Sequence, residues 1–256
     1  FMEANPTEPI NENRAKRSNG WDLVLYIVCG FGLFTLAGGL VGSLMGEHTN
    51  SLLYSVLVFL FNVIFLGGTA LVMGAGRGKF SLREIGLVPP RWKWSWLALA
   101  IALVLLLLPV RGGLGVLVEY LLNGNLDSLT MRSQLILPEG TSWLSFAVTL
   151  LFVGILVPLS EELFFRAAIY TWLRDHTPVW VAVLISSALF GLGHADSLGV
   201  VAASFIMGVV NALVFEKTRS IWVPVAIHAA NNSLAIILVY LAALLVKLVP
   251  GLQALP

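Results

Sequence analysis

The sequence predicts an all-α protein, a polytopic bundle of about seven transmembrane helices. Of the 256 residues, 58% are hydrophobic and only 11% are charged, whereas soluble domains carry roughly 25% charged residues. Apolar segments, each about long enough to cross a bilayer, alternate with short polar loops. We expect helices at residues 21–45, 52–73, 94–122, 142–174, 179–194, 198–215 and 221–248.

The chain is expected to contain one membrane domain, residues 21–256, after a polar cytoplasmic tail at residues 1–20. The tail is mixed in charge, so we expect no cleavable signal peptide. The net charge of +1 gives no indication of a nucleic-acid partner, and we expect none. A single cysteine, Cys29, excludes a disulfide framework and a cysteine-based zinc site.

The first two apolar segments and the linker after them have distinct compositions. The first segment is rich in glycine, which allows helices to approach closely. A polar linker at residues 74–93 follows the second, and we expect a short interfacial turn of helix within it at residues 80–87. Trp92, Trp94 and Trp96 then mark an aromatic belt at the membrane boundary.

The third and fourth segments are the places where the number of helices is open. Arg111 lies near Pro109 and two glycines in the third segment, which predicts a bend or a break there. The fourth segment would be about 50 Å long at 1.5 Å per residue, longer than a bilayer requires. Its part after Glu162 is therefore expected to run obliquely or along the membrane interface. A break in either segment would give eight transmembrane helices instead of seven.

Lysine and arginine predict the orientation, because cytoplasmic loops carry an excess of both. With the helices above, the side of the N-terminus holds Arg14, Lys16, Arg17, Arg77, Lys79, Arg83, Arg91, Lys93, Arg174, Lys217 and Arg219. The opposite side holds only Arg132 and Lys247. The N-terminus is therefore expected in the cytoplasm.

Two carboxylates and a guanidinium interrupt the apolar fourth segment. Ionised groups are costly at membrane depth, so Glu161 and Glu162 suggest a functional site. Arg166 follows Glu162 by four residues, the favourable order for an ion pair on a helix. Glu161 points about 100° away and can face another partner. Pro158, one turn earlier, should bend the helix or free backbone groups. The alternative is a structural ion pair buried between helices, which needs only one glutamate.

Two later segments carry similar polar groups. Phe190 and His194 are four residues apart at the end of the fifth, and His228 shares a helix face with Asn231 and Asn232 in the seventh. Each residue alone is more often a hydrogen-bonding group between helices. Together they are nearly all the strongly polar groups of three helices, and if they converge they form one polar cavity.

Such a cavity is suited to hydrolysis. A carboxylate in an apolar site suits a general base, a histidine can relay the proton, and N–H donors can stabilise an oxyanion. None of these motifs places a serine or cysteine as an obvious nucleophile, and Ser160 is expected to bond to its own helix. Water is then the attacking group, and hydrolysis of a peptide bond in or near the membrane fits best.

These residues resemble the CPBP family, which comprises type II CAAX prenyl proteases, bacteriocin-processing enzymes and abortive-infection proteins. The resemblance covers about residues 143–240. It rests on the motifs Glu161-Glu162-Leu-Phe-Phe-Arg166, Phe190-Gly-Leu-Gly-His194 and His228-Ala-Ala-Asn-Asn232, which match the family pattern in order and spacing. The predicted catalytic residues are therefore Glu161, Glu162, Arg166, His194, His228 and Asn232.

The resemblance implies a glutamate-dependent intramembrane endopeptidase in which Glu161 and His194 activate water. His228 and Asn232 would form an oxyanion hole, and the remaining two residues of the set would order the site. Members were once proposed to be metalloproteases, but the chain has no His-Glu-x-x-His arrangement. We expect no cofactor, with zinc bound by the Glu/His cluster as the alternative.

The compact chain is expected to be an integral protein of a bacterial plasma membrane, with a membrane-embedded or membrane-tethered peptide or protein as its substrate. The alternative function is non-enzymatic: a proton-coupled transporter, or an immunity or scaffold protein that retains the fold. Buried glutamate and histidine would then form a proton relay. The lack of a visible inverted repeat argues against transport.

Overall fold

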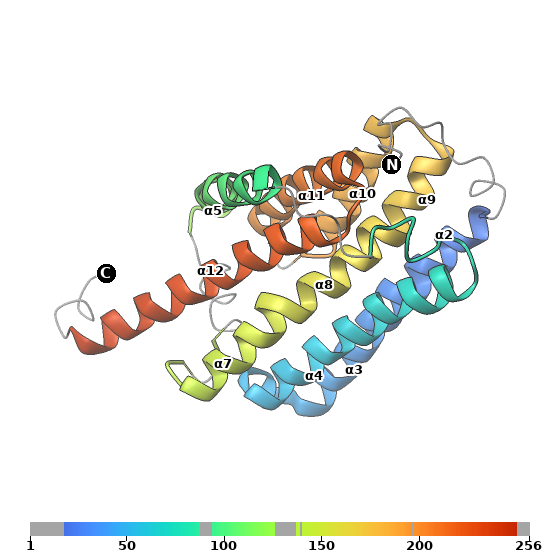
Figure 1. Cartoon of the computed structure of the whole chain (residues 1–256). Coiled ribbons are helices and arrows are strands. Elements are labelled where there is room, and N and C mark those ends of the chain that lie inside the picture. The colour runs from blue at the N-terminus through green and yellow to red at the C-terminus, as the bar shows by residue number, and fades with distance from the viewer. Residues whose placement is uncertain (1–17, 88–93, 126–136, 139, 196, 250–256) are drawn as a thin grey trace.

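The protein is a bundle of long apolar helices (Figure 1). The computed structural model describes residues 18–87, 94–125, 137–138, 140–195 and 197–249. Within these ranges, six helices are long and apolar enough to cross a membrane, and a seventh apolar helix, α10 (Val179–Leu192), is shorter. The predicted helical membrane bundle is confirmed.

The first two spans form an antiparallel pair. The first comprises α2 (Gly20–Ile27), the π-helical η1 (Val28–Gly32), α3 (Leu33–Met45) and the 3₁₀-helical η2 (Gly46–Asn50). The second comprises α4 (Leu52–Asn62) and the π-helical η3 (Val63–Gly67) and η4 (Ala70–Gly76). Asn19 caps α2 and Ser51 caps α4, each accepting a backbone N–H with its side chain.

The third span, α5 (Trp94–Asn123), is one continuous helix. The break considered near Arg111 is absent, although Pro109 lies inside the helix. Neighbouring helices can satisfy the backbone groups that a proline releases in a membrane helix. Arg111 is held by other helices, because its Nε donates to the carbonyl of Ala203 at 3.1 Å and its Nη1 to Asn231 Oδ1 at 2.6 Å.

The fourth span runs from Trp143 to His176 as a single rod through the middle of the molecule (Figure 1). Its parts are α7 (Trp143–Leu151), η5 (Phe152–Leu156), α8 (Val157–Glu162), η6 (Leu163–Tyr170) and α9 (Thr171–His176), of which η5 and η6 are π-helical. All eight residues of η6 are buried. The part after Glu162 therefore passes through the protein core, and its oblique or interfacial course relative to the membrane stays a prediction. With both segments continuous, the described residues give no support for eight helices.

Pro158 explains a local feature of this rod. Proline has no N–H, so the carbonyl of Gly154, four residues earlier, loses its helical partner. Ser233 Oγ donates to that carbonyl at 3.3 Å, and Asn232 Nδ2 donates to the neighbouring carbonyl of Val153 at 3.2 Å. The last span thus satisfies backbone acceptors at the irregular turn beside the glutamates.

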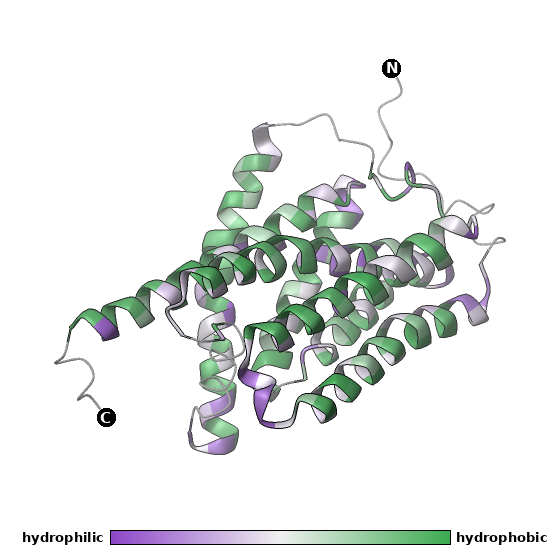
Figure 2. Ribbon diagram, turned by 90° about the horizontal axis from the view of Figure 1, so that it is seen from below, coloured by the Kyte–Doolittle hydropathy of each residue, from purple (hydrophilic) through white to green (hydrophobic). Residues whose placement is uncertain are grey.

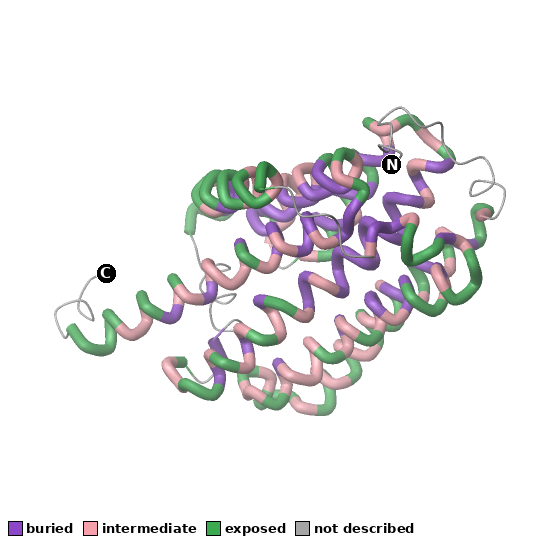
Figure 3. Tube along the Cα trace, in the orientation of Figure 1, coloured by how far each residue is buried: buried purple, intermediate pink, exposed green. Residues whose placement is uncertain are grey.

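The last helices complete the core. The helix α11 (Leu198–Thr218) packs against α10 and α5, and α12 (Trp222–Leu248) packs against α5, α11 and the fourth span. Buried residues concentrate where α8, α9, α10, α11 and the start of α12 meet, whereas α3, α5 and the end of α12 are largely exposed (Figure 3).

The helices are strongly apolar along most of their length (Figure 2), and many large apolar side chains are exposed. Leu36 is 69% exposed, Leu40 59% and Leu105 64%. Large contiguous apolar surfaces are rare on soluble monomers. Lipid chains account for this surface, as expected for an integral membrane protein.

Loop residues expected on the cytoplasmic side gather at one end of the bundle. Trp172 Nε1 donates to the carbonyl of Asn19 at 2.9 Å, which joins the end of α9 to the start of α2. At the same end, Arg77 and Lys79 form ion pairs with the buried Asp22 at 3.2 and 2.9 Å. The side of the membrane on which this end lies stays a prediction from the Lys and Arg distribution.

The turn expected at residues 80–87 is present and is docked onto the protein. Ile85 is fully buried, and its carbonyl accepts from the N–H of Ile221 at 3.2 Å. Trp222 Nε1 donates to the carbonyl of Leu87 at 2.8 Å. Gly86 has φ +65°, and a Cβ there would collide with the carbonyl oxygen of Arg219. The turn therefore fixes the start of α12, and Gly86 permits the close approach.

Gly86→Ala is expected to lower the thermal midpoint of the detergent-solubilised protein. A left-handed backbone costs a non-glycine residue about 1–3 kcal/mol, and the collision with the α11–α12 turn adds to that. Gly78→Ala is the matched control, because Gly78 has φ +68° but open space around a Cβ. Equal melting shifts for the two variants would contradict the contact as described.

Candidate active site

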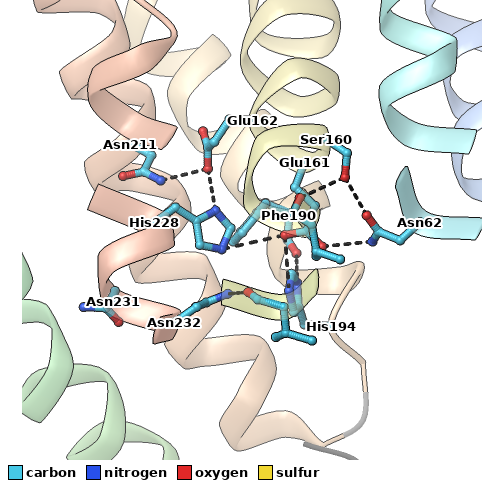
Figure 4. Close-up of polar contacts among 12 residues, drawn as sticks. Asn62, Ser160, Glu161, Glu162, Phe190, His194, Asn211, His228, Asn231 and Asn232 are labelled. Carbon is cyan, nitrogen blue, oxygen red and sulfur yellow. Dashed lines mark hydrogen bonds and ion pairs between the residues drawn. The ribbon is translucent and has the colours of Figure 1, made fainter. Parts of the chain in front are cut away.

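Three helix segments bring the predicted site residues together (Figure 4). The end of α8 supplies the two glutamates, the turn after α10 supplies His194, and the first half of α12 supplies His228 and Asn232. Of these five side chains, only His194 lies outside a helix. Its segment still forms a helical turn, because the N–H of His194 donates to the carbonyl of Gly191 at 2.9 Å.

Glu162 is completely buried and surrounded by donors. Its Oε2 lies 3.0 Å from Arg166 Nε, an ion pair between adjacent helical turns as the sequence predicted. Its Oε1 accepts from Asn211 Nδ2 at 2.8 Å and lies 2.9 Å from His228 Nδ1. The buried guanidinium of Arg166 lies 5.0 Å from the centre of the Phe190 ring. Glu162 therefore anchors its neighbours and has little freedom to act on a substrate.

The contact with Glu162 determines which ring nitrogen of His228 carries the proton. Because Nδ1 faces the carboxylate of Glu162, Nδ1 carries a proton and donates it. The other ring nitrogen, Nε2, then points towards Glu161, with 3.7 Å between Nε2 and Glu161 Oε2. His228 is only 2% exposed. One buried imidazole thus lies between two carboxylates.

The two carboxylate oxygens of Glu161 have different hydrogen-bonding contacts. Its Oε1 accepts from Asn62 Nδ2 at 3.1 Å. Its Oε2 is buried and has no hydrogen-bond partner among the residues described. It lies 3.7 Å from His228 Nε2 and 3.9 Å from His194 Nε2. The Nδ1 of His194 lies 2.9 Å from the carbonyl of Phe190, so Nδ1 donates there. Both histidines therefore direct Nε2 towards the same oxygen of Glu161 (Figure 4).

The two asparagines of α12 have different surroundings. Asn232 is half-buried, and one N–H of its amide is engaged by the Val153 carbonyl. The same nitrogen carries a second N–H. Asn231 is buried, accepts from Arg111 and donates to the carbonyl of Val104 at 3.4 Å. Asn231 therefore links α12 to α5, and Asn232 is the asparagine on the side of the fourth span.

Side chains from helices outside the three motifs also contribute to the site. Asn62 was not predicted, although a lone amide in an apolar segment is a usable signal. Ser160, expected to bond to its own helix, does so through the carbonyl of Val157 at 2.8 Å, and its Oγ also lies 2.7 Å from Asn62 Oδ1. Asn211 of α11 holds Glu162. Long-range contacts of this kind leave no fixed spacing in a sequence.

Metal binding was the alternative for the Glu/His cluster. Across the described ranges, no group of three or more His, Cys, Asp or Glu side chains has a geometry that could hold a metal ion. The acid that is closest to His228, Glu162, is paired with Arg166. The arrangement offers hydrogen-bond donors and acceptors for a small polar molecule.

A helical bundle that spans the membrane and buries carboxylates, imidazoles and amides at one place is an integral membrane protein with an enzyme-like polar centre. Residues 143–234 match the family model described as type II CAAX prenyl endopeptidase, Rce1-like. This match and the relatives below confirm the resemblance inferred from the three motifs.

Three curated relatives match this chain over stretches of 85 to 96 residues. YdiL of Bacillus subtilis (strain 168), whose name describes a candidate membrane peptidase, is 35% identical over 85 residues, which is 33% of this chain and 34% of YdiL. The membrane-embedded CAAX protease MroQ of Staphylococcus aureus (strain USA300) is 31% identical over 96 residues, 35% of this chain and 38% of MroQ.

A third relative, an uncharacterised 24.3 kDa protein of Escherichia coli, is 29% identical over 94 residues, 35% of this chain and 43% of that protein. The chain thus matches between about a third and two fifths of the length of these relatives. No solved structure gives a significant match.

Proposed function

We propose that the protein is an intramembrane endopeptidase that hydrolyses peptide bonds of membrane-associated substrates with a water activated by Glu161. The observation that carries the proposal is the direction of two imidazole Nε2 atoms towards one buried oxygen of Glu161, at 3.7 and 3.9 Å. These separations are too long for direct hydrogen bonds, so the oxygen of Glu161 keeps its lone pairs for a water molecule beside the two rings. The match of residues 143–234 to a prenyl endopeptidase family model and the protease name of MroQ support the same class of reaction.

The proposed reaction has two steps, attack by water and collapse of the tetrahedral intermediate. Glu161 Oε2 takes a proton from water while the water oxygen attacks the carbonyl carbon of the peptide bond. The resulting tetrahedral intermediate carries a negative oxygen. When it collapses, the C–N bond breaks and the leaving nitrogen takes up a proton held by the Glu161–His194 pair. A positioned general base of this kind contributes about 10²–10⁴-fold to the rate.

His228 and Asn232 are the proposed oxyanion donors. His228 already donates from Nδ1 to Glu162, so donation from Nε2 requires both ring protons. The positive charge of that state would lie between two carboxylates. Asn232 would use the amide proton that is not bonded to Val153. Removing one oxyanion donor costs about 10²–10³-fold in other acyl-transfer enzymes.

The testing experiment is cleavage of a library of membrane-tethered reporter peptides by the purified protein in liposomes. Cleavage by the wild type, with loss in Glu161→Gln and His194→Ala, is the expected result. Equal cleavage by all three proteins would contradict the proposal. A proton flux across the liposome membrane without any cleavage would favour the transporter alternative.

The same assay tests the absence of a cofactor. Chelator treatment followed by removal of the chelator is expected to leave the cleavage rate within about twofold of the untreated protein, because the proposed chemistry uses only Glu161, the two histidines and Asn232. A chelator-treated sample with restored zinc is the control. Loss of cleavage with chelator and recovery with zinc would assign the Glu/His cluster to a metal role instead.

A further inference from the structure

We propose that Asn62, in the second span, is a positioning residue that fixes the orientation of the Glu161 carboxylate. This inference rests on the proposed function of Glu161 as the base that activates water. Asn62 lies outside residues 143–234, the part of the chain that matches the family model. The N-terminal half would then contribute directly to the site and would not serve only to anchor it in the membrane.

The contact between the two residues is direct. Asn62 Nδ2 donates to Glu161 Oε1 at 3.1 Å, and the Glu161 oxygen that faces the histidines is the other one. A carboxylate can rotate about its terminal bond, and its two oxygens are chemically equivalent. Holding one oxygen therefore determines where the second one points. Hydrogen bonds to an ionised acceptor are roughly twice as strong as neutral ones, so this donor can hold the group.

Ser160 determines which end of the amide faces Glu161. Its single hydroxyl proton lies between two acceptors, Asn62 Oδ1 at 2.7 Å and the Val157 carbonyl at 2.8 Å from Oγ, and it can therefore support this end of the amide. If the amide were turned around, its oxygen would face the carboxylate of Glu161, and two acceptors would repel each other. Ser160 and Glu161 are adjacent on α8, so one helix orients the amide and then receives its N–H. Asn62 thus bridges the side chains of Ser160 and Glu161 (Figure 4).

Burial makes these contacts costly to break. Asn62 is 8% exposed, Ser160 2% and Glu161 6%. Bulk water cannot reach these buried groups to replace a lost partner. A hydrogen bond is also electrostatically stronger in a region of low dielectric constant. An asparagine in an apolar helix is unfavourable unless its amide is satisfied.

The backbone of the second span allows Asn62 to lie close to Glu161. The π-helical η3 begins at Val63, immediately after Asn62, and single π-helical turns within helices often occur at functional sites. One turn further on, Gly67 packs against α8, where a Cβ would lie 3.2 Å from Ser160 Cβ. This close packing of η3 on α8 keeps the amide within reach of the carboxylate.

The experiment is steady-state cleavage of the best reporter peptide in liposomes. Asn62→Leu keeps the size of the side chain and removes the donor. We expect kcat to fall by about 10–100-fold, the cost of misplacing a reacting group by roughly 1 Å. KM should stay within about twofold of the wild-type value. Ser55→Ala is the matched control, since it removes another buried polar group from the same helix, and it should retain wild-type kcat.

A double-mutant cycle separates positioning from general weakening of the fold. Ser160→Ala should lower kcat by less than Asn62→Leu, and should have no further effect in the Asn62→Leu background, because Ser160 acts through the amide. If Asn62→Leu does not fold, Ser160→Ala alone carries the test. Wild-type kcat in Asn62→Leu, with Glu161→Gln inactive, would overturn the inference and leave the proposed function standing.

A spectroscopic measurement covers the case in which no reporter is cleaved. The infrared difference between wild type and Glu161→Gln identifies the carboxyl band of Glu161. That band should shift in Asn62→Leu and stay in place in Ser55→Ala. An unshifted band in Asn62→Leu would overturn the positioning role whatever the protein catalyses.

Discussion

Glu161→Gln is expected to reduce the rate of reporter cleavage by about 10²–10⁴-fold, the contribution of a positioned general base. Glutamine keeps the size of the side chain and can still accept from Asn62 through its amide oxygen. Its NH₂ group would face the two histidines and cannot take a proton from water. KM should change little, because substrate binding does not depend on the transferred proton. The measurement is kcat and KM in liposomes.

The matched control is Glu216→Gln. Glu216 is also on a helix of the bundle, but it is bound to Tyr170 at 2.8 Å and to Arg174 at 3.2 Å, near the end of α11. It should retain nearly all of the wild-type kcat. If Glu161→Gln cleaved as fast as Glu216→Gln, Glu161 would not be the base, and the proposed mechanism would fail.

Arg166→Met is expected to have the largest effect on stability. The guanidinium is completely buried with Glu162, and removing one partner of a buried ion pair costs about 3–5 kcal/mol, because the other charge is left without compensation. We expect a marked drop in the thermal midpoint and loss of cleavage, since Glu162 also holds His228. The readout is thermal unfolding in detergent together with kcat.

Two comparisons make this prediction specific. Arg219→Met removes an arginine whose side chain is 46% exposed and should change stability by less than about 1 kcal/mol. The double variant Glu162→Gln with Arg166→Met should be more stable than Arg166→Met alone, because it removes both charges. A double variant that is less stable than the single one would show that packing over Phe190, not charge, dominates at Arg166.

Helix positions were predictable because a bilayer imposes one simple rule. A span must be apolar over about 20 residues, and the polar loops between spans are plainly visible in this sequence. Local packing was less predictable. The sequence after Glu162 does not reveal whether this segment lies at the protein surface or in the core. Only the structure shows that all eight residues of η6 are buried. The continuity of α5 at Pro109 likewise depends on neighbouring helices.

The site was predictable to the extent that its residues form motifs. Glu161, His194 and His228 converge, and the i, i+4 ion pair of Glu162 with Arg166 is present. Their catalytic roles stay predictions. The contacts of Asn62 and Asn211 join residues at least 49 positions apart. No helical spacing relates such residues, so only the packing of the spans brings them together.

The bond between Asn232 and the Val153 carbonyl affects how mutants at the site can be interpreted. Asn232→Ala would remove the proposed oxyanion donor and at the same time release a backbone acceptor on the rod that carries Glu161. A loss of activity in this variant is therefore the sum of a chemical effect and a displacement of the base. Ser233→Ala frees the adjacent carbonyl of Gly154 without altering any proposed donor, and it measures the second contribution alone.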